Sequence, residues 1–427
     1  MNPEVVRAGM IARLREDLVG PHQHDEVFQG VRIRPSDVYL TGILWTSNDR
    51  MGGEEDDGQE TNDEDDDSSS AVTPVGQQRP CSMGLSFCLD KESSGSGSLD
   101  VSIAFATYDF EQLEPIGGKG LQLKWTRREH RITLNSFDTH ESEGREIPLK
   151  LDGLNATVSL HVRSRLATVG RMVTLTLINR STPPVGDRNT AEAMMLFQCS
   201  MEVKSIGNTK LIPRPPRPAA NDEDEQIGRL LYRNSPEFAT GHQCSASWES
   251  TGGIASVIKT DWIPETSVVA FREDGSDVFK PLVENAAFDA AQLSKMSNES
   301  LLERLMQLPV AYEEWIGQRN KEMGSLNDEL RPIAKHNLAT CTQICTRIIE
   351  GVKAMRRDPR LLEAFKLANA SMAIQHSWKP TGKASPLKWR PFQLGFILLA
   401  APSVCNAESP DREVLDLLWF PTGGGKT

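Results

Sequence analysis

The last eleven residues constrain the fold of this chain more than any other stretch. They read LLWFPTGGGKT at positions 417–427, an apolar run followed by a glycine-rich turn that closes with lysine and threonine. Glycines adopt positive φ and carry no side chain, so their consecutive backbone N–H groups can surround phosphate oxygens. Residues 414–420 have the composition of a buried parallel strand, the element that precedes such a loop. The stretch therefore predicts a phosphate-binding loop that opens an α/β domain.

Each residue of this loop has an expected role in binding ATP and Mg²⁺. Lys426 would reach the β- and γ-phosphates as the catalytic cation, and the Thr427 hydroxyl would bind Mg²⁺. Phe420 stands where the pattern G-x-x-x-x-G-K-[ST] has its first glycine, so the sequence departs from the pattern there. The alternative is a glycine turn without a phosphate role. The remaining expected phosphate ligands are four backbone N–H groups, those of Thr422, Gly423, Gly424 and Gly425.

A second stretch lies upstream, at residues 388–393, with the sequence KWRPFQ. A glutamine amide both donates and accepts hydrogen bonds, so Gln393 can pair with N6 and N7 of adenine. Together the two stretches resemble the Q motif and motif I of superfamily 2 helicases. The resemblance implies nucleotide contacts from Arg390, Phe392 and Gln393. The alternative is a helix that begins at Pro391 with Gln393 in solvent.

Length and composition indicate a soluble protein of several domains. A chain of 427 residues predicts two to four domains, and 38% hydrophobic with 25% charged residues is typical of globular proteins. No apolar run reaches the roughly 18 residues that a membrane span needs, and charged residues interrupt any secretory signal. The seven cysteines include no Cys-x-x-Cys pair. We therefore expect a cytoplasmic protein with reduced thiols and no membrane contact.

The acidity of the chain is concentrated in one segment. Residues 54–67 hold ten acidic side chains and no basic one; without these ten, the formal net charge of −12 would be −2. The surrounding residues 51–80 contain few apolar side chains, which predicts a disordered acidic loop. One interpretation is a solvated linker. The other is a self-contact, in which residues 54–67 compete with DNA for a basic groove of the same protein.

The hydrophobic pattern changes its period along the chain. Residues 1–50 predict an amphipathic helix (3–19) and short strands that pack on the body. Residues 81–285 have mostly period two, which indicates an antiparallel sandwich or barrel. Residues 286–380 have period 3.6 and predict a helical domain, and residues 381–427 would begin a RecA-like domain. The predicted fold is multidomain α+β: a β-rich, sandwich-like domain, a helical domain, and the start of a RecA-like α/β P-loop domain.

The order of these pieces resembles the N-terminal part of the DrmA family, the helicases of bacterial DISARM anti-phage defence systems. The residues that carry the resemblance are the RPFQ and WFPTGGGKT motifs, with FATGH at 238–242 and parts of 364–373. The resemblance implies ATP-dependent work on DNA and a DrmB-like partner protein. It also implies further motor motifs that these 427 residues lack, so we expect this chain alone to be inactive. The alternative is a non-enzymatic module that binds DNA or a partner.

Overall fold

The computed structural model describes residues 3–30, 33–46, 79–91, 98–113, 122–140, 142–167, 169–215, 222–266, 276–285, 287–378 and 385–416. Most of the predicted acidic loop and all of the predicted phosphate-binding loop lie outside these ranges. The chain divides into two units, residues 1–218 with 234–266, and residues 219–233 with 267–427. The boundaries expected at residues 50 and 380 fall inside these units.

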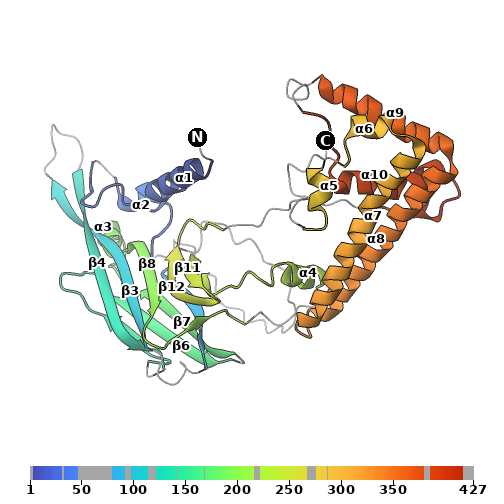
Figure 1. Cartoon of the computed structure of the whole chain (residues 1–427). Helices are drawn as coiled ribbons and strands as arrows, with labels where there is room; N and C mark the ends of the chain where they lie inside the picture. Colours follow the sequence, from blue (N-terminus) through green and yellow to red (C-terminus); the bar gives the residue numbers. More distant parts are fainter. Residues whose placement is uncertain are drawn as a thin grey trace, which may run out of the picture. The chain divides into compact units, whose positions relative to one another are not determined.

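The first unit is built on an antiparallel sheet to which the described residues contribute twelve strands, and the sheet is curled (Figure 1). The strand order is β1-β4-β3-β8-β12-β9-β2-β7-β6-β5, with β10 beside β2 and β11 beside β12. The strands are β1 (Val27–Gly30), β2 (Ser82–Asp90), β3 (Ser98–Leu113), β4 (Gln122–Asp138), β5 (Glu146–Leu149), β6 (Val158–Leu166), β7 (Gly170–Asn179), β8 (Phe197–Ser205), β9 (Leu211–Ile212), β10 (Ala239–His242), β11 (Ser245–Thr251) and β12 (Ile254–Asp261).

One face of this sheet forms the core of the first unit. On β3, for example, Val101, Ile103 and Phe105 alternate with more exposed residues and are fully or almost fully buried. The β-rich prediction is confirmed, but the two-layered sandwich is replaced by a single curled sheet. A strand has a side-chain period of two in either architecture, so the pattern could not distinguish them.

The predicted N-terminal helix forms as α1 (Pro3–Leu18). The Leu18 carbonyl at its end accepts hydrogen bonds from the N–H groups of Leu40 (2.9 Å) and Thr41 (3.1 Å). Its predicted apolar face is exposed, however, with Val6, Met10 and Leu14 all at least 40% accessible. Helical spacing predicts that an apolar face exists and not what covers it. Here the apolar face is exposed, while Arg15 of the same helix donates to Asp261 of β12 at 2.6 Å.

A buried carboxylate joins the N-terminal segment to the sheet. Glu26 accepts hydrogen bonds from the hydroxyls of Tyr39 (2.6 Å) and Tyr108, and from the His22 N–H (3.2 Å). Burial raises the pKa of both tyrosines, which keeps their hydroxyls protonated as donors. The residues before the acidic segment are therefore part of the sheet unit, with β1 paired to β4 and the short helix α2 (Pro35–Val38) following.

The described residues on either side of positions 47–78 contact each other. The Trp45 N–H donates to the Pro80 carbonyl at 2.9 Å, and the Arg79 guanidinium lies 3.8 Å from the centroid of the Trp45 ring. A cation over an indole face is attracted by the ring quadrupole. The acidic segment is thus an insertion whose two anchors are in direct contact.

The second unit is helical, as the change to period 3.6 predicts. Its helices are α4 (Glu223–Leu231), α5 (Lys280–Glu284), α6 (Ala290–Lys295), α7 (Asn298–Glu322), α8 (Arg331–Arg357), α9 (Pro359–Ser377) and α10 (Pro391–Cys405); the short helix α3 (Arg188–Ala193) belongs to the first unit. Asp358 caps α9, because its side chain accepts from the Arg360 N–H, and Pro359 occupies the first turn.

Helices α8 and α10 pack closely at a glycine. An ideal Cβ on Gly351 would lie 1.9 Å from the Leu398 carbonyl oxygen of α10. Gly395 of α10 faces Ile348 of α8, so small residues on both helices permit the approach. This packing places α10 against the buried stripe of α8 that includes Val352 and Met355.

We predict that Gly351→Ala destabilises the second unit by about 1–3 kcal/mol, because the new methyl group overpacks a backbone contact. Gly317→Ala is the matched control: Gly317 lies inside α7 with nothing within 4 Å of an added Cβ. It should stabilise the unit by about 0.5–1 kcal/mol through helix propensity. Urea unfolding followed by circular dichroism measures both. Equal stability of the two variants would contradict the close-packing argument.

Candidate nucleotide site

The predicted adenine-reading residues form the first turn of α10. Arg390 is the N-cap, Pro391 opens the helix, and the Gln393 side-chain oxygen accepts a hydrogen bond from the Arg390 N–H at 3.0 Å. This is a capping box, in which the third helical residue reaches back to the N-cap. The side chain of Gln393 is half-buried and held in a fixed place, which differs from the solvated glutamine of the alternative interpretation.

The segment before this helix is attached to α6 and α9. The backbone N–H of Trp389 donates to the Phe288 carbonyl, and the backbone N–H of Ala290 donates to the Leu387 carbonyl, both at 2.9 Å. The Trp389 indole N–H donates to the side-chain oxygen of Asn369 at 2.7 Å. These bonds fix where α10 begins relative to its neighbours in the second unit.

Asn369 is a positioning residue that the sequence analysis did not identify. It is 2% exposed, and its amide nitrogen donates to the Phe365 carbonyl at 2.9 Å. Leu362 and Phe365 lie on the same face of α9 at helical spacing. An asparagine in line with a buried apolar stripe needs a polar partner, and this was the signal available in the sequence.

Arg347 of α8 holds the segment that leads toward the glycine-rich loop. Its guanidinium donates two hydrogen bonds to Asp416, at 2.6 and 2.8 Å, and one to Asp411 at 3.1 Å. The hydrogen bonds from Arg347 hold the pKa of Asp416 below its usual range. Asp411 lies in the 3-10 turn η4 (Pro410–Glu413), and residues 414–416 belong to no strand.

Arg390 is the N-cap of α10, and Phe392 and Gln393 lie in its first turn. Lys426 and Thr427, with the rest of residues 417–427, lie outside the described ranges. The phosphate-binding loop, its ligands ATP and Mg²⁺, and the RecA-like domain that it would open therefore remain predictions. The described part of the chain contains no group of three or more His, Cys, Asp or Glu residues placed to hold a metal ion.

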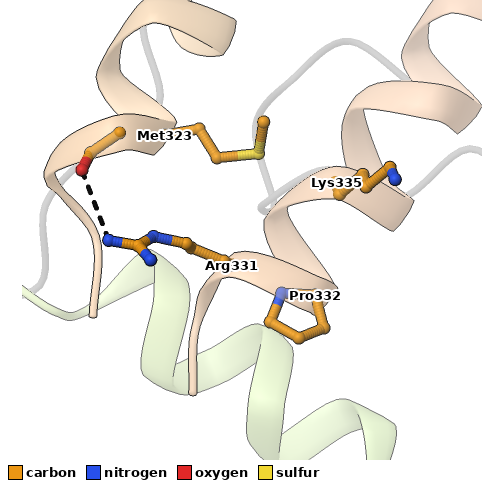
Figure 2. A pocket seen from close by; sticks show the side chains of 5 residues that line it. Met323, Arg331, Pro332 and Lys335 are labelled. Atoms are coloured by element: carbon orange, nitrogen blue, oxygen red, sulfur yellow. Dashed lines mark hydrogen bonds between the residues drawn. The ribbon is translucent and has the colours of Figure 1, made fainter. Parts of the chain in front are cut away.

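A separate hollow of about 460 Å³ lies between the 3-10 turn that follows α7 (Met323–Ser325) and the first turns of α8. Figure 2 shows its lining residues, which include Met323, Pro332 and Lys335, with Arg331 turned toward the Gly324 carbonyl, to which it donates at 3.5 Å. None of the predicted nucleotide-binding residues lines this hollow. Among the described helices, none combines the length and apolar character needed to cross a bilayer.

We predict that Arg347→Met releases residues 410–416. Asp411 and Asp416 lose the cation that they share, so the amides of this segment should exchange hydrogen about ten-fold faster. A ten-fold change corresponds to about 1.4 kcal/mol in the free energy of local opening, a reasonable value for ion pairs that solvent partly screens. Arg356→Met is the control, since Arg356 is exposed on the same helix and has no ion pair with any described residue. Unchanged exchange in the Arg347 variant would show that the ion pair does not hold this segment.

Comparison with known proteins supports the resemblance seen in the motifs. No family model matches the sequence. The chain is 29% identical, over 478 aligned positions, to the DISARM protein DrmA of Bacillus paralicheniformis. The alignment covers 99% of this chain and 40% of that relative, so the chain spans about two fifths of the relative's length. Along almost its whole length, this chain is therefore similar to DrmA, a protein of the DISARM defence system.

Proposed function

We propose that this chain provides the nucleotide-binding front part of an ATP-dependent DNA helicase or translocase that acts in anti-phage defence. The observation that carries the proposal is the similarity to DISARM protein DrmA over 99% of the chain. The motifs at 388–393 and 417–427 add the chemical part of the argument, because one suits adenine and the other suits phosphates.

The first turn of α10 is suited to reading adenine. The Gln393 carboxamide both accepts and donates hydrogen bonds, which is the chemistry that a paired contact with adenine requires, and its oxygen already accepts from the Arg390 N–H. The capping bond also restricts the rotamers of Gln393, which lowers the entropy lost on binding. The bond from Trp389 to Asn369 supports this turn from behind.

In the proposed site, the backbone N–H groups of residues 422–425 would bind the phosphates and Lys426 would supply a positive charge at the β- and γ-oxygens. The Thr427 hydroxyl would hold Mg²⁺, which would supply further positive charge to the phosphates. The bonds from Arg347 to Asp411 and Asp416 link α8 to the chain that enters this loop. Residues 411 and 416 are thereby bonded to α8, the same helix that packs against α10.

We predict that Lys426→Ala weakens binding of Mg²⁺-ATP by at least about ten-fold, because a charged hydrogen bond to phosphate is worth about 1.5–3 kcal/mol. Titration with a fluorescent ATP analogue measures the affinity. Lys335→Ala removes the same charge from the hollow between α7 and α8 and should leave affinity unchanged. If Lys426→Ala binds as tightly as the parent chain, the phosphate-binding role is wrong.

We predict that Gln393→Ala lowers the preference for ATP over GTP, since a bidentate contact to adenine is worth about 1–3 kcal/mol. Gln393→Glu separates this contact from capping. Its carboxylate still accepts from the Arg390 N–H, but it cannot donate to adenine N7. This variant should lose ATP affinity and keep its unfolding midpoint. An unchanged nucleotide preference in Gln393→Ala, with parental ATP affinity in Gln393→Glu, would refute the adenine contact.

A module that binds DNA or a partner protein is the second candidate function. The observation that favours it is the size of the sheet unit, which spans most of the first 266 residues and includes none of the predicted nucleotide ligands. For the whole protein, we propose DNA and a DrmB-like protein as partners. Residues 54–67, with their dense carboxylates, are a proposed internal competitor for DNA.

A further inference from the structure

The face of the sheet that points away from the core carries a polar row across four strands. The register places Arg163 of β6 beside Thr174 of β7, Thr174 beside Ser86 of β2, and Ser86 beside Thr240 of β10. Most of their sequence neighbours, on the opposite face, belong to the apolar core: Val162, Val173, Leu175, Leu85, Phe87 and Ala239. Adjacent strands lie about 4.8 Å apart, so this row is about 14 Å long.

A second row runs beside the first. His161 of β6 is paired with Thr176 of β7, which is paired with Gly84 of β2, and Gly84 with His242 of β10. Arg165 follows on β6, two residues after Arg163 and on the same face. We call this surface the polar face; its side chains are those of His161, Arg163, Arg165, Thr174, Thr176, Ser86, Thr240 and His242.

Hydrogen bonds fix the centre of the polar face. The Ser86 hydroxyl is 2.6 Å from the Thr174 hydroxyl and 2.7 Å from His242 Nε2. At the far end of the row, an Arg214 guanidinium nitrogen donates to the Thr240 hydroxyl. Ser86 is itself buried, at 7% exposed, so its bonds serve to fix the more accessible Thr174 and His242 before any ligand arrives, which reduces the entropy cost of binding.

The charge of the polar face is positive and comes from arginine. Arg163 and Arg165 are exposed, and neither forms an ion pair with any residue that the structure describes. The nearby Glu146 is held by Arg180 through two bonds of 2.9 Å, and these bonds, with one from Ser159, lower the pKa of Glu146 to about 2. This carboxylate is therefore already paired with a cation.

His242, at the β10 end of the second row, adds no charge near neutral pH. Burial, with Arg214 nearby, lowers the pKa of His242 below its ordinary value, so its ring is neutral at pH 7. The arginines thus flank a row of neutral hydroxyls. Arginine, serine and threonine are the side chains that contact phosphate and sugar oxygens in complexes with DNA. No Phe, Tyr or Trp belongs to either row, so the face lacks the large rings on which bases stack.

We propose that the polar face binds the sugar-phosphate backbone of a DNA strand without regard to sequence. The choice of DNA over another polyanion rests on the proposed function. The hydroxyl row between cations favours phosphate, which accepts several hydrogen bonds along a strand, over isolated carboxylates of an acidic protein. The face would hold a strand on the sheet unit, independently of nucleotide binding in the other unit.

The test is the double variant Arg163→Glu with Arg165→Glu in the whole chain. Anisotropy of a labelled mixed-sequence single-stranded oligonucleotide, without nucleotide, measures affinity over a range of salt concentrations. Affinity should fall at least ten-fold at low salt. The slope of log affinity against log salt should become shallower by about 1.4, because each lost phosphate contact contributes about 0.7 on single strands.

The matched control is Arg7→Glu with Arg188→Glu. Both arginines are exposed, lie on α1 and α3 of the same unit, and have no ion pair with a described residue. This control changes the net charge equally and should keep the parental slope. The unfolding midpoints of both double variants check that the fold is kept. If the double glutamate variant at positions 163 and 165 unfolds, the double glutamine variant, Arg163→Gln with Arg165→Gln, takes its place.

Three results would overturn the proposal. The first is that the Arg163 and Arg165 variants keep the affinity and salt slope of the parent. The second is that the control loses as much affinity as they do. The third is that the parent binds polyglutamate more tightly than the oligonucleotide, which would indicate that the natural ligand of the face is an acidic protein. Lys426→Ala separates this proposal from the proposed function. It should bind the oligonucleotide as the parent does. ATP binding by this variant therefore tests the proposed function, and DNA binding by the Arg163 and Arg165 variants tests the polar face.

Discussion

The approach of α8 to α10 at Gly351 is the contact on which the candidate nucleotide site depends. A side chain at this position would meet the Leu398 carbonyl, so the two helices can lie this close only because the residue is glycine. One turn earlier on α8, Arg347 binds the segment that contains Asp411 and Asp416. A single helix thereby positions both the turn that holds Gln393 and the chain that enters the glycine-rich loop.

Features set by neighbours in the sequence could be predicted from the sequence. The cap at Asp358, the buried stripe that includes Ile348 and Val352, and the helix start at Pro391 depend on spacing of a few residues. The bonds from Arg347 could not be predicted, since its partners are 64 and 69 residues away. Whether strands with a period of two form one sheet or two depends on which strands, far apart in the sequence, pair with each other. The alternation of apolar and polar residues along a strand does not indicate its partner.

The same distinction applies within the candidate site. Gln393 was recognised for its chemistry, whereas its capping bond to Arg390 follows from helix geometry and was missed. Asn369 carried a signal, a polar residue on a buried stripe, but its partner Trp389 became evident only in the structure. The sequence named candidate ligands of the nucleotide; the residues that position them had to come from the fold.

The contact between Trp45 and Pro80 sets a limit on what the acidic insertion can touch. The sequence has 32 residues between Thr46 and Arg79, so none of them is more than about 16 residues along the chain from one of these two residues. Fully extended, a chain of that length reaches about 55 Å. Every surface in contact with residues 54–67 must therefore lie inside a sphere of that radius centred on the Trp45 ring. The number of residues between Trp45 and Arg79 can also change without shifting the register of β1 or β2, because the contact of Trp45 with Arg79 and Pro80 fixes both flanks to the sheet unit.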